Sequence, residues 1–270
     1  MMDGSPRYDR PPVRATTLTV FVEPIENFDL TMIAPLHQRW SEKFPALAQA
    51  FPRRRPEGLP ELDPLSFSSG WPLPAVEQVD NSLSRSISYQ QDQISLQWRF
   101  DPEAADTTYP GFATLSGELS SVFGYFIEVV ARLGDKPLRI QGCRCLYVNQ
   151  LNDIGGIEWL AGYISDWQSR KVGSYLDDAE YVGLRVKKTS ENQDLGTRRI
   201  AMSELDSGEE FGTTRLDIDV VSIPLPKSKL AEVPPGEAAR EMLNDAHATL
   251  IATFQDSAND EMRARWGFRQ

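Results

Sequence analysis

An alternation of apolar and polar residues over 93–100 constrains the fold of this chain most strongly. The apolar members of this run are Ile94, Leu96, Trp98 and Phe100. Because successive side chains of a strand point to opposite faces, the run predicts a strand with one buried and one solvated face. A second alternating run over 84–90 precedes it, and Gln91-Asp92 between the two runs indicates a hairpin turn.

Helical periodicity marks the segments expected to cover the buried face. Between Leu115 and Leu133, apolar residues recur at spacings of three and four, and Gly134 follows as a stop signal. A shorter helix is expected between Pro35 and Pro45, because proline is favoured in the first turn of a helix and stops one that it follows.

The order of these elements favours an α+β fold built on antiparallel sheets. Further strands are expected over 15–22 and 138–149. Residues 13–150 therefore follow the order strand, helix, strand, strand, helix, strand, which predicts a ferredoxin-like N-terminal half. Such domains host many unrelated functions, so this expectation favours none of them.

The C-terminal half, 151–270, is predicted to contain strands followed by a long helix over 236–256, with a short helix over 157–167 before them. The strands are expected over 181–188, 197–202 and 215–222. Because no Gly/Ser-rich linker divides the chain, we expect the two halves to pack as one body. The polar residues 1–12, which end in two prolines, are expected to form a flexible arm.

An excess of acidic residues narrows the classes of partner. The chain has 39 Asp and Glu residues against 28 Lys and Arg residues, a net charge of −11. Such a surface repels phosphate backbones, so nucleic-acid binding is not expected. No segment has the apolar length of a membrane span and the first residues do not resemble a signal peptide, so we expect a cytoplasmic protein without membrane contact.

Few residues are available for metal or redox chemistry. Two histidines and two cysteines offer little for a metal cage or a disulfide framework, and we expect Cys143 and Cys145 to be reduced and buried. His247 lies on the apolar stripe of the last helix, where a core or interface histidine is favoured over a general acid or base. The glycine-rich run 153–156 lacks the nucleotide-binding motifs, so no cofactor is predicted.

A basic, proline-rich segment is the first candidate for partner binding. Residues 51–74 contain six prolines, a density that neither a helix nor a central strand accepts. They predict a long surface excursion that carries Arg53, Arg54 and Arg55. This cluster is either part of a solvated loop or a docking site for an acidic partner.

Asp217 and Asp219 form a second candidate site. Two carboxylates that are two residues apart on a strand share a face and could hold Mg²⁺. The apolar residues alternating with them point the acids towards solvent, where Arg185 and Lys187 of a nearby strand would form a cross-strand ladder with them. We favour the ladder, which leaves these two residues as weak metal candidates.

The C-terminal residues form a third candidate. Residues 257–260 resemble a capping box that opens a short second helix carrying Met262 and Trp266 on one face. We expect these two side chains to close over the core or over a subunit interface, which makes Trp266 a candidate for partner binding.

Two stretches of the chain resemble a known family. Leu146–Asn149 is similar to a strand that reads Arg-Tyr-Ile-Asn in that family. The tail motif is matched by Leu216–Val220, Ala246-His247, Phe254 and Met262–Gly267. The family is an uncharacterised, sporadically distributed bacterial one of about this chain length. The chain departs from its pattern at Leu146, where the family has Arg. The family has no accepted catalytic residues, and its patchy distribution implies a role in toxin–antitoxin or phage-defence loci.

The leading functional hypothesis is a non-enzymatic subunit that binds another protein, of the antitoxin, immunity or accessory type. One alternative is a metal-dependent enzyme acting on nucleotides or phosphates through Asp217 and Asp219. Another is a homo-oligomeric sensor of a small ligand. Metal titration and nucleotide turnover distinguish the enzyme from the first hypothesis, and a ligand-dependent shift in melting temperature would favour the sensor.

Overall fold

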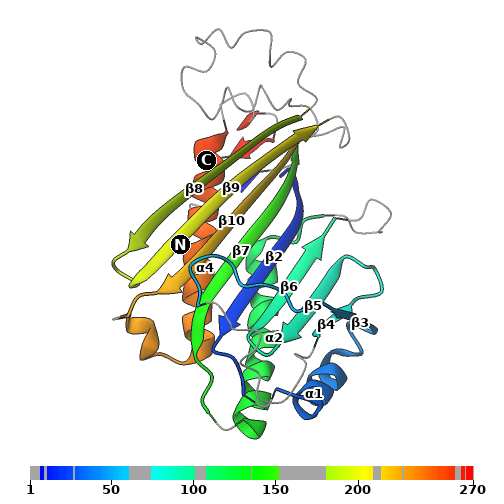
Figure 1. Ribbon diagram of the computed structural model, residues 1–270. Helices are drawn as coiled ribbons and strands as arrows, with labels where there is room; N and C mark the ends of the chain where they lie inside the picture. Colours follow the sequence, from blue (N-terminus) through cyan, green and yellow to red (C-terminus); the bar gives the residue numbers. More distant parts are fainter. Residues whose placement is uncertain are drawn as a thin grey trace.

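A nine-stranded antiparallel sheet forms the centre of the computed structural model (Figure 1). The structure describes residues 7–8, 11–26, 28–60, 74–100, 108–134, 136–151, 181–208, 214–226, 228–258, 263–264 and 266–269. In spatial order the strands are β3 (Ala46–Ala50), β4 (Ala75–Val79), β5 (Arg85–Gln90), β6 (Gln93–Arg99), β2 (Val13–Val22), β7 (Ile140–Leu151), β10 (Thr214–Pro224), β9 (Thr197–Gly208) and β8 (Tyr181–Asn192). The expected α+β class is confirmed.

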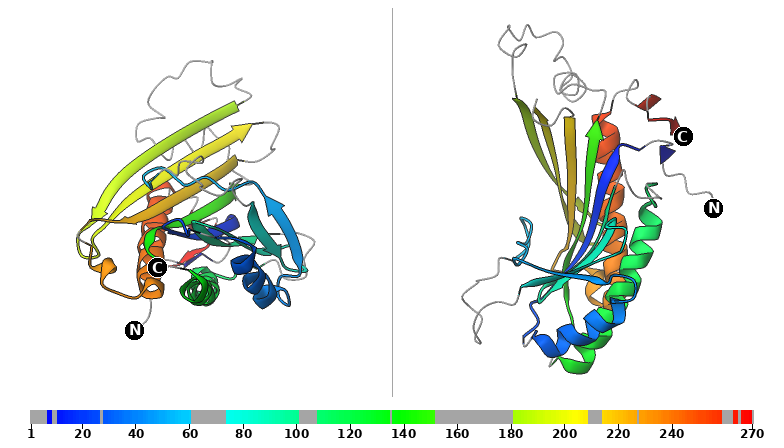
Figure 2. Two further views of the ribbon diagram at one scale, coloured as in Figure 1. Left: turned by 60° about the horizontal axis from the view of Figure 1, so that its bottom comes forward. Right: turned by 90° about the vertical axis from the view of Figure 1, so that its right-hand side faces the viewer.

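Three helices of the described residues lie on one face of this sheet (Figure 2). They are α1 (Leu30–Trp40), α2 (Phe112–Leu133) and α4 (Pro235–Ser257), and a short 3-10 helix (Lys229–Ala231) precedes α4. Alternate residues of the central strands are buried beneath the helices, as the period of a strand requires. In β10, for example, Leu216, Ile218 and Val220 join one core with Phe126 of α2 and Leu250 of α4.

The long periodic segments form the elements that they predict. β5 and β6 pair as a hairpin in which Gln90 faces Gln93, so the turn lies at Gln91-Asp92. α2 ends at Leu133 before Gly134, whose amide donates to the carbonyl of Val130. β8, β9 and β10 are longer than expected, because pairing in the sheet extends each strand past its alternating core.

The first helix begins earlier than the sequence pattern indicates. Asp29 caps its N-terminus by accepting a hydrogen bond from the amide of Thr31 at 2.8 Å. Pro35 therefore lies inside α1 and not in its first turn. The helix ends at Trp40, four residues before the buried Phe44, which was expected to belong to it.

The ferredoxin-like N-terminal half is not confirmed. β3 and β4, which were not predicted, extend the sheet beyond β5, while β10 pairs with β7 on the other side. The N-terminal strands are therefore part of one larger sheet, and the strands of both halves are joined by main-chain hydrogen bonds. β10 pairs with both β7 and β9 along its length, which connects the halves at the middle of the sheet.

The two ends of the chain meet in a small second sheet. β1 (Arg7–Tyr8) pairs with β11 (Phe268–Arg269) in antiparallel register. At these two residues the N-terminal arm, predicted to be flexible, is held by the C-terminus. The predicted short helix over 157–167 and the glycine-rich run 153–156 lie outside the described residues.

A buried carboxylate fixes α4 to the sheet. Asp245 is 8% exposed and accepts hydrogen bonds from Thr197 at 2.8 Å, Ser222 at 2.9 Å and Asn192 at 2.8 Å. Because a buried charge is costly unless it is hydrogen-bonded, these partners select one position for the helix over β9 and β10.

Candidate protein-binding surface

Part of the proline-rich excursion runs across the face of the sheet that the helices leave uncovered. We call residues 53–60 the strap, and in Figure 1 they cross in front of the central strands. Leu59 at the end of the strap packs with Phe21, Val221 and Ile223 in a second, smaller apolar cluster. Gly58 has a φ of +93°, and a Cβ at this position would lie 2.4 Å from Ile200, so only glycine permits this close approach.

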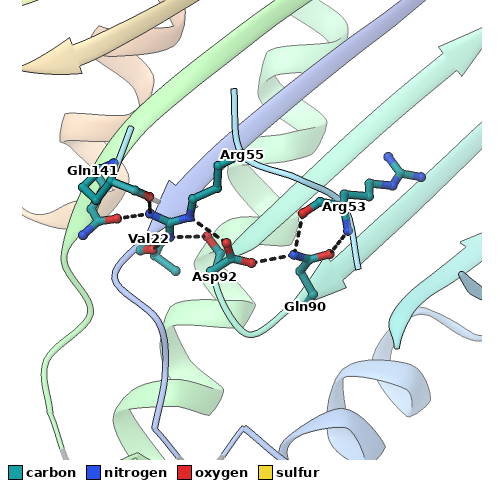
Figure 3. A network of polar contacts seen from close by, with 7 residues as sticks. Val22, Arg53, Arg55, Gln90, Asp92 and Gln141 are labelled. Atoms are coloured by element: carbon teal, nitrogen blue, oxygen red, sulfur yellow. Dashed lines mark hydrogen bonds and ion pairs between the residues drawn. The ribbon is translucent and has the colours of Figure 1, made fainter. Parts of the chain in front are cut away.

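Arg55 anchors the strap through a buried ion pair (Figure 3). Its Nε donates to Asp92 at 2.7 Å, and the two side chains are only 5% and 1% exposed. The other guanidinium nitrogens donate to the carbonyl of Val22 and to the side chain of Gln141. A planar guanidinium with several fixed donors suits such a site, because every buried polar group then has a partner.

The three arginines of the predicted docking cluster have different surroundings. The main chain of Arg53 exchanges two hydrogen bonds with the side chain of Gln90, and its guanidinium lies 3.3 Å from Glu77. Arg54 is exposed. Arg55 is an internal cation, so its guanidinium is not available to a partner, and docking by this cluster remains a prediction for Arg54 and in part for Arg53.

Asp217 and Asp219 share a strand face but have different arginine partners. Both oxygens of Asp219 accept hydrogen bonds from Arg144 of β7, at 2.7 and 2.8 Å. Both oxygens of Asp217 are held by Arg215 of the same strand, at 2.9 and 2.7 Å. The expected partners Arg185 and Lys187 are therefore corrected, and Asp219, at 8% exposed, does not point into solvent as expected.

Replacing Asp219 by Asn should lower the free energy of unfolding by about 1–3 kcal/mol, because it leaves the partly buried Arg144 without its charged partner. The matched change Asp217→Asn should cost less than about 1 kcal/mol, since Arg215 is 52% exposed. Urea unfolding measures both effects. Equal losses in the two variants would contradict the different burial of the pairs, and stoichiometric Mg²⁺ binding in calorimetry that both variants abolish would support the metal alternative.

Both cysteines are fully buried on the helix side of β7. Burial raises the pKa of Cys143 and of Cys145 well above the ordinary value of 9.0, because a thiolate would lie among apolar groups. The folded state therefore holds these protons more tightly than the unfolded state does. The contribution of these buried, protonated thiols to the free energy of unfolding is fully present below pH 9 and is lost as the pH rises above that value.

A thiol reagent should modify neither cysteine at pH 8 while the protein is folded, because the reactive thiolate is absent from the core. After unfolding in guanidinium, two thiols per chain should react, as absorbance of the released chromophore would show. Rapid reaction of a full equivalent in the native protein would contradict this burial.

His247 belongs to an aromatic cluster between α2, α4 and the sheet. Its ring stacks on Phe112 with centroids 3.7 Å apart and lies 5.9 Å from the ring of Tyr147. The hydroxyls of Tyr147 and Tyr109 lie 2.5 Å apart. Burial raises the pKa of Tyr109 to about 12 and also raises the pKa of Tyr147, so both phenols are neutral. These contacts agree with the predicted core or interface role of His247.

Trp266, the predicted partner-binding residue outside the arginine cluster, is 8% exposed and packs against Phe254 of α4, with ring centroids 5.1 Å apart. Its side chain thus covers the end of α4 and offers little surface to a partner. Met262, predicted to act with it, lies outside the described residues.

The outer edge of β8 is a surface that sequence reasoning missed. β8 is the last strand of the sheet and pairs with β9 over all of its 12 residues, while no described strand pairs with its other side. Arg185, Val186, Lys187 and Lys188 follow one another on this strand, and all four are exposed. Three cations within four residues of an acidic chain were the signal available in the sequence.

The three cations of β8 are exposed but differ in their partners. Lys187 forms an ion pair with Glu57 of the strap, and its side chain is 41% exposed. Arg185 donates to the sulfur of Met202 at about 3 Å, and Lys188 has no ion pair within the part of the chain that the structure describes. Arg185 and Lys187 lie on the strap side of the sheet and Lys188 on the opposite side, as strand alternation requires.

No family model and no curated protein matches this chain. Among solved structures, the regulatory subunit of aspartate kinase from Thermus flavus is similar to it over 90% of this chain and 97% of that one. The sequence identity is 12% and the TM-score is 0.18, which is too low for the likeness to carry an argument. The resemblance to the uncharacterised bacterial family remains a prediction. No helix within the described ranges is both long and apolar enough to cross a bilayer.

Proposed function

We propose that this protein is a non-enzymatic accessory subunit that binds an extended, acidic segment of another protein along the edge of β8. The observation that carries the proposal is this exposed edge strand with three basic residues among the four positions 185–188. An edge strand offers unpaired main-chain donors and acceptors, to which an incoming strand adds by β-augmentation.

The basic side chains decide which strand would fit. Opposite charges directly across a strand pair contribute about 0.2–1 kcal/mol each, while like charges destabilise the pair. A second copy that paired about Val186 would place Arg185 opposite Lys187. An acidic strand is therefore the matched partner, and main-chain hydrogen bonds would supply the remaining affinity.

The carboxylates that favoured the enzymatic alternative have other roles in this proposal. Both carboxylate oxygens of Asp219 accept hydrogen bonds from Arg144, and this pair joins two neighbouring strands of the sheet. Both oxygens of Asp217 accept from Arg215, and this pair lies on the surface of the sheet. The proposal therefore assigns them to structure.

Charge reversal on β8 tests the proposal in a capture experiment from the native host. Arg185→Glu with Lys188→Glu should reduce recovery of the bound protein at least tenfold. The control, Arg132→Glu with Arg240→Glu, changes the net charge equally at exposed positions on α2 and α4 and should leave recovery unchanged. Recovery at the wild-type level with both double variants would contradict binding at β8. The same reduction of recovery in both variants would indicate that only the net charge matters.

A further inference from the structure

The opposite edge of the sheet differs from β8 in charge and in polarity. β3 contains Ala46, Leu47, Ala48, Gln49 and Ala50, with no charged residue, and most of it is exposed. Leu47 is 53% exposed, and Phe51, directly after the strand, is 94% exposed. An exposed, uncharged edge strand readily pairs with another strand, and natural proteins usually protect such edges with charges or proline.

We infer that β3 pairs with β3 of a second copy of this chain, which joins two sheets edge to edge about a twofold axis at Ala48. In this antiparallel register Ala46 faces Ala50 of the second copy, and Leu47 faces Gln49 of the second copy. The strand is thus close to self-complementary, as an interface between identical subunits must be.

The absence of charged residues on β3 favours contact between two copies at this edge. Each copy has a net charge of −11, so two copies repel each other on average, and contact costs least where neither surface has a charge. The small alanine side chains allow the strands to approach closely. One residue beyond the strand, Phe51 comes opposite Pro45 of the second copy, which covers the most exposed aromatic side chain of the described residues.

The size of the contact predicts a reversible dimer. The strand has five residues, and with Phe51 it buries less than the roughly 1,200–2,000 Å² of a stable specific interface. Association should therefore depend on concentration, with monomer and dimer both present over the micromolar range.

Sedimentation velocity over a concentration series tests this inference. The wild-type protein should shift from monomer to dimer, while Phe51→Ser and Ala48→Lys should remain monomeric at the highest concentration. Both positions are exposed, so neither change removes a buried contact. The control Leu133→Ser, at a 42% exposed position on α2, should associate like the wild type. So should Arg185→Glu with Lys188→Glu, which separates this inference from the proposed function.

Cross-linking tests the register. Because Cys143 and Cys145 are buried, Ala48→Cys adds one accessible thiol, and a short bis-maleimide should join two copies through it. Ala131→Cys, exposed on α2, should give no covalent dimer. The inference is wrong if the wild type is monomeric throughout, if Phe51→Ser and Ala48→Lys still dimerise, or if the Ala48→Cys variant does not cross-link. Loss of a captured host protein in Phe51→Ser without a change in association would identify a different occupant.

Discussion

Replacing Arg55 by Ala should lower the free energy of unfolding by about 3–5 kcal/mol, because it leaves the carboxylate of Asp92 buried without its counter-charge. Asp92 is 1% exposed, and its remaining side-chain partner is Gln90 at 2.6 Å. The substitution also removes the donors to the carbonyl of Val22 and to Gln141.

Guanidinium unfolding measures this loss, with Arg54→Ala as the matched control. Arg54 is the exposed neighbour of Arg55, so its removal should change the free energy of unfolding by no more than about 0.5 kcal/mol. Limited proteolysis should also cleave the strap faster in Arg55→Ala than in the control. A loss below about 1 kcal/mol, with unchanged proteolysis, would show that the strap does not depend on this ion pair.

Replacing Trp266 by Ala should cost about 3–5 kcal/mol, the range for truncating a buried large aromatic side chain. The ring packs against Phe254 of α4, and Trp266 lies two residues before β11, which pairs with the N-terminal arm. The melting temperature should fall accordingly. Truncation after Asp256 should have at least this effect, since it also removes Ser257 and Ala258, which are 1% and 5% exposed.

Phe51→Ala is the matched aromatic control for Trp266, because Phe51 is 94% exposed and its loss opens no cavity. Its melting temperature, measured at a concentration where the protein is monomeric, should be close to that of the wild type. An unchanged melting temperature for Trp266→Ala would contradict the packing at the end of α4 and would favour a docking role for this residue.

The elements with a strong period were predictable from the sequence, and those without one were not. The hairpin at Gln91-Asp92 and α2 follow from alternation and from spacings of three and four. β3 reads Ala-Leu-Ala-Gln-Ala, which has no β-branched residue, and its place at the edge depends on β4. The predicted N-terminus of α1 was wrong because proline is a strong start signal, and Pro35 outweighed Asp29, although Asp29 is a regular N-cap.

The candidate sites show what sequence spacing cannot supply. Arg55 pairs with Asp92, 37 residues away, and Arg144 pairs with Asp219, 75 residues away. No local sequence pattern identifies either pair, because the order of strands in the sheet brings the partners together. The basic cluster and the acidic pair were recognisable as unusual residues, whereas the partners that determine their roles required the fold.

Hydrogen–deuterium exchange on β8 in the presence of its captured partner tests the central proposal most directly. An added strand forms main-chain hydrogen bonds to alternate residues of this edge, so amides within Tyr181–Asn192 that face outward should exchange at least tenfold more slowly in the complex. Amides of β3 at the opposite edge should not change at a protein concentration below that of self-association. If the complex forms and exchange along β8 is unchanged, the partner does not bind as a strand at this edge, and the proposed function is contradicted.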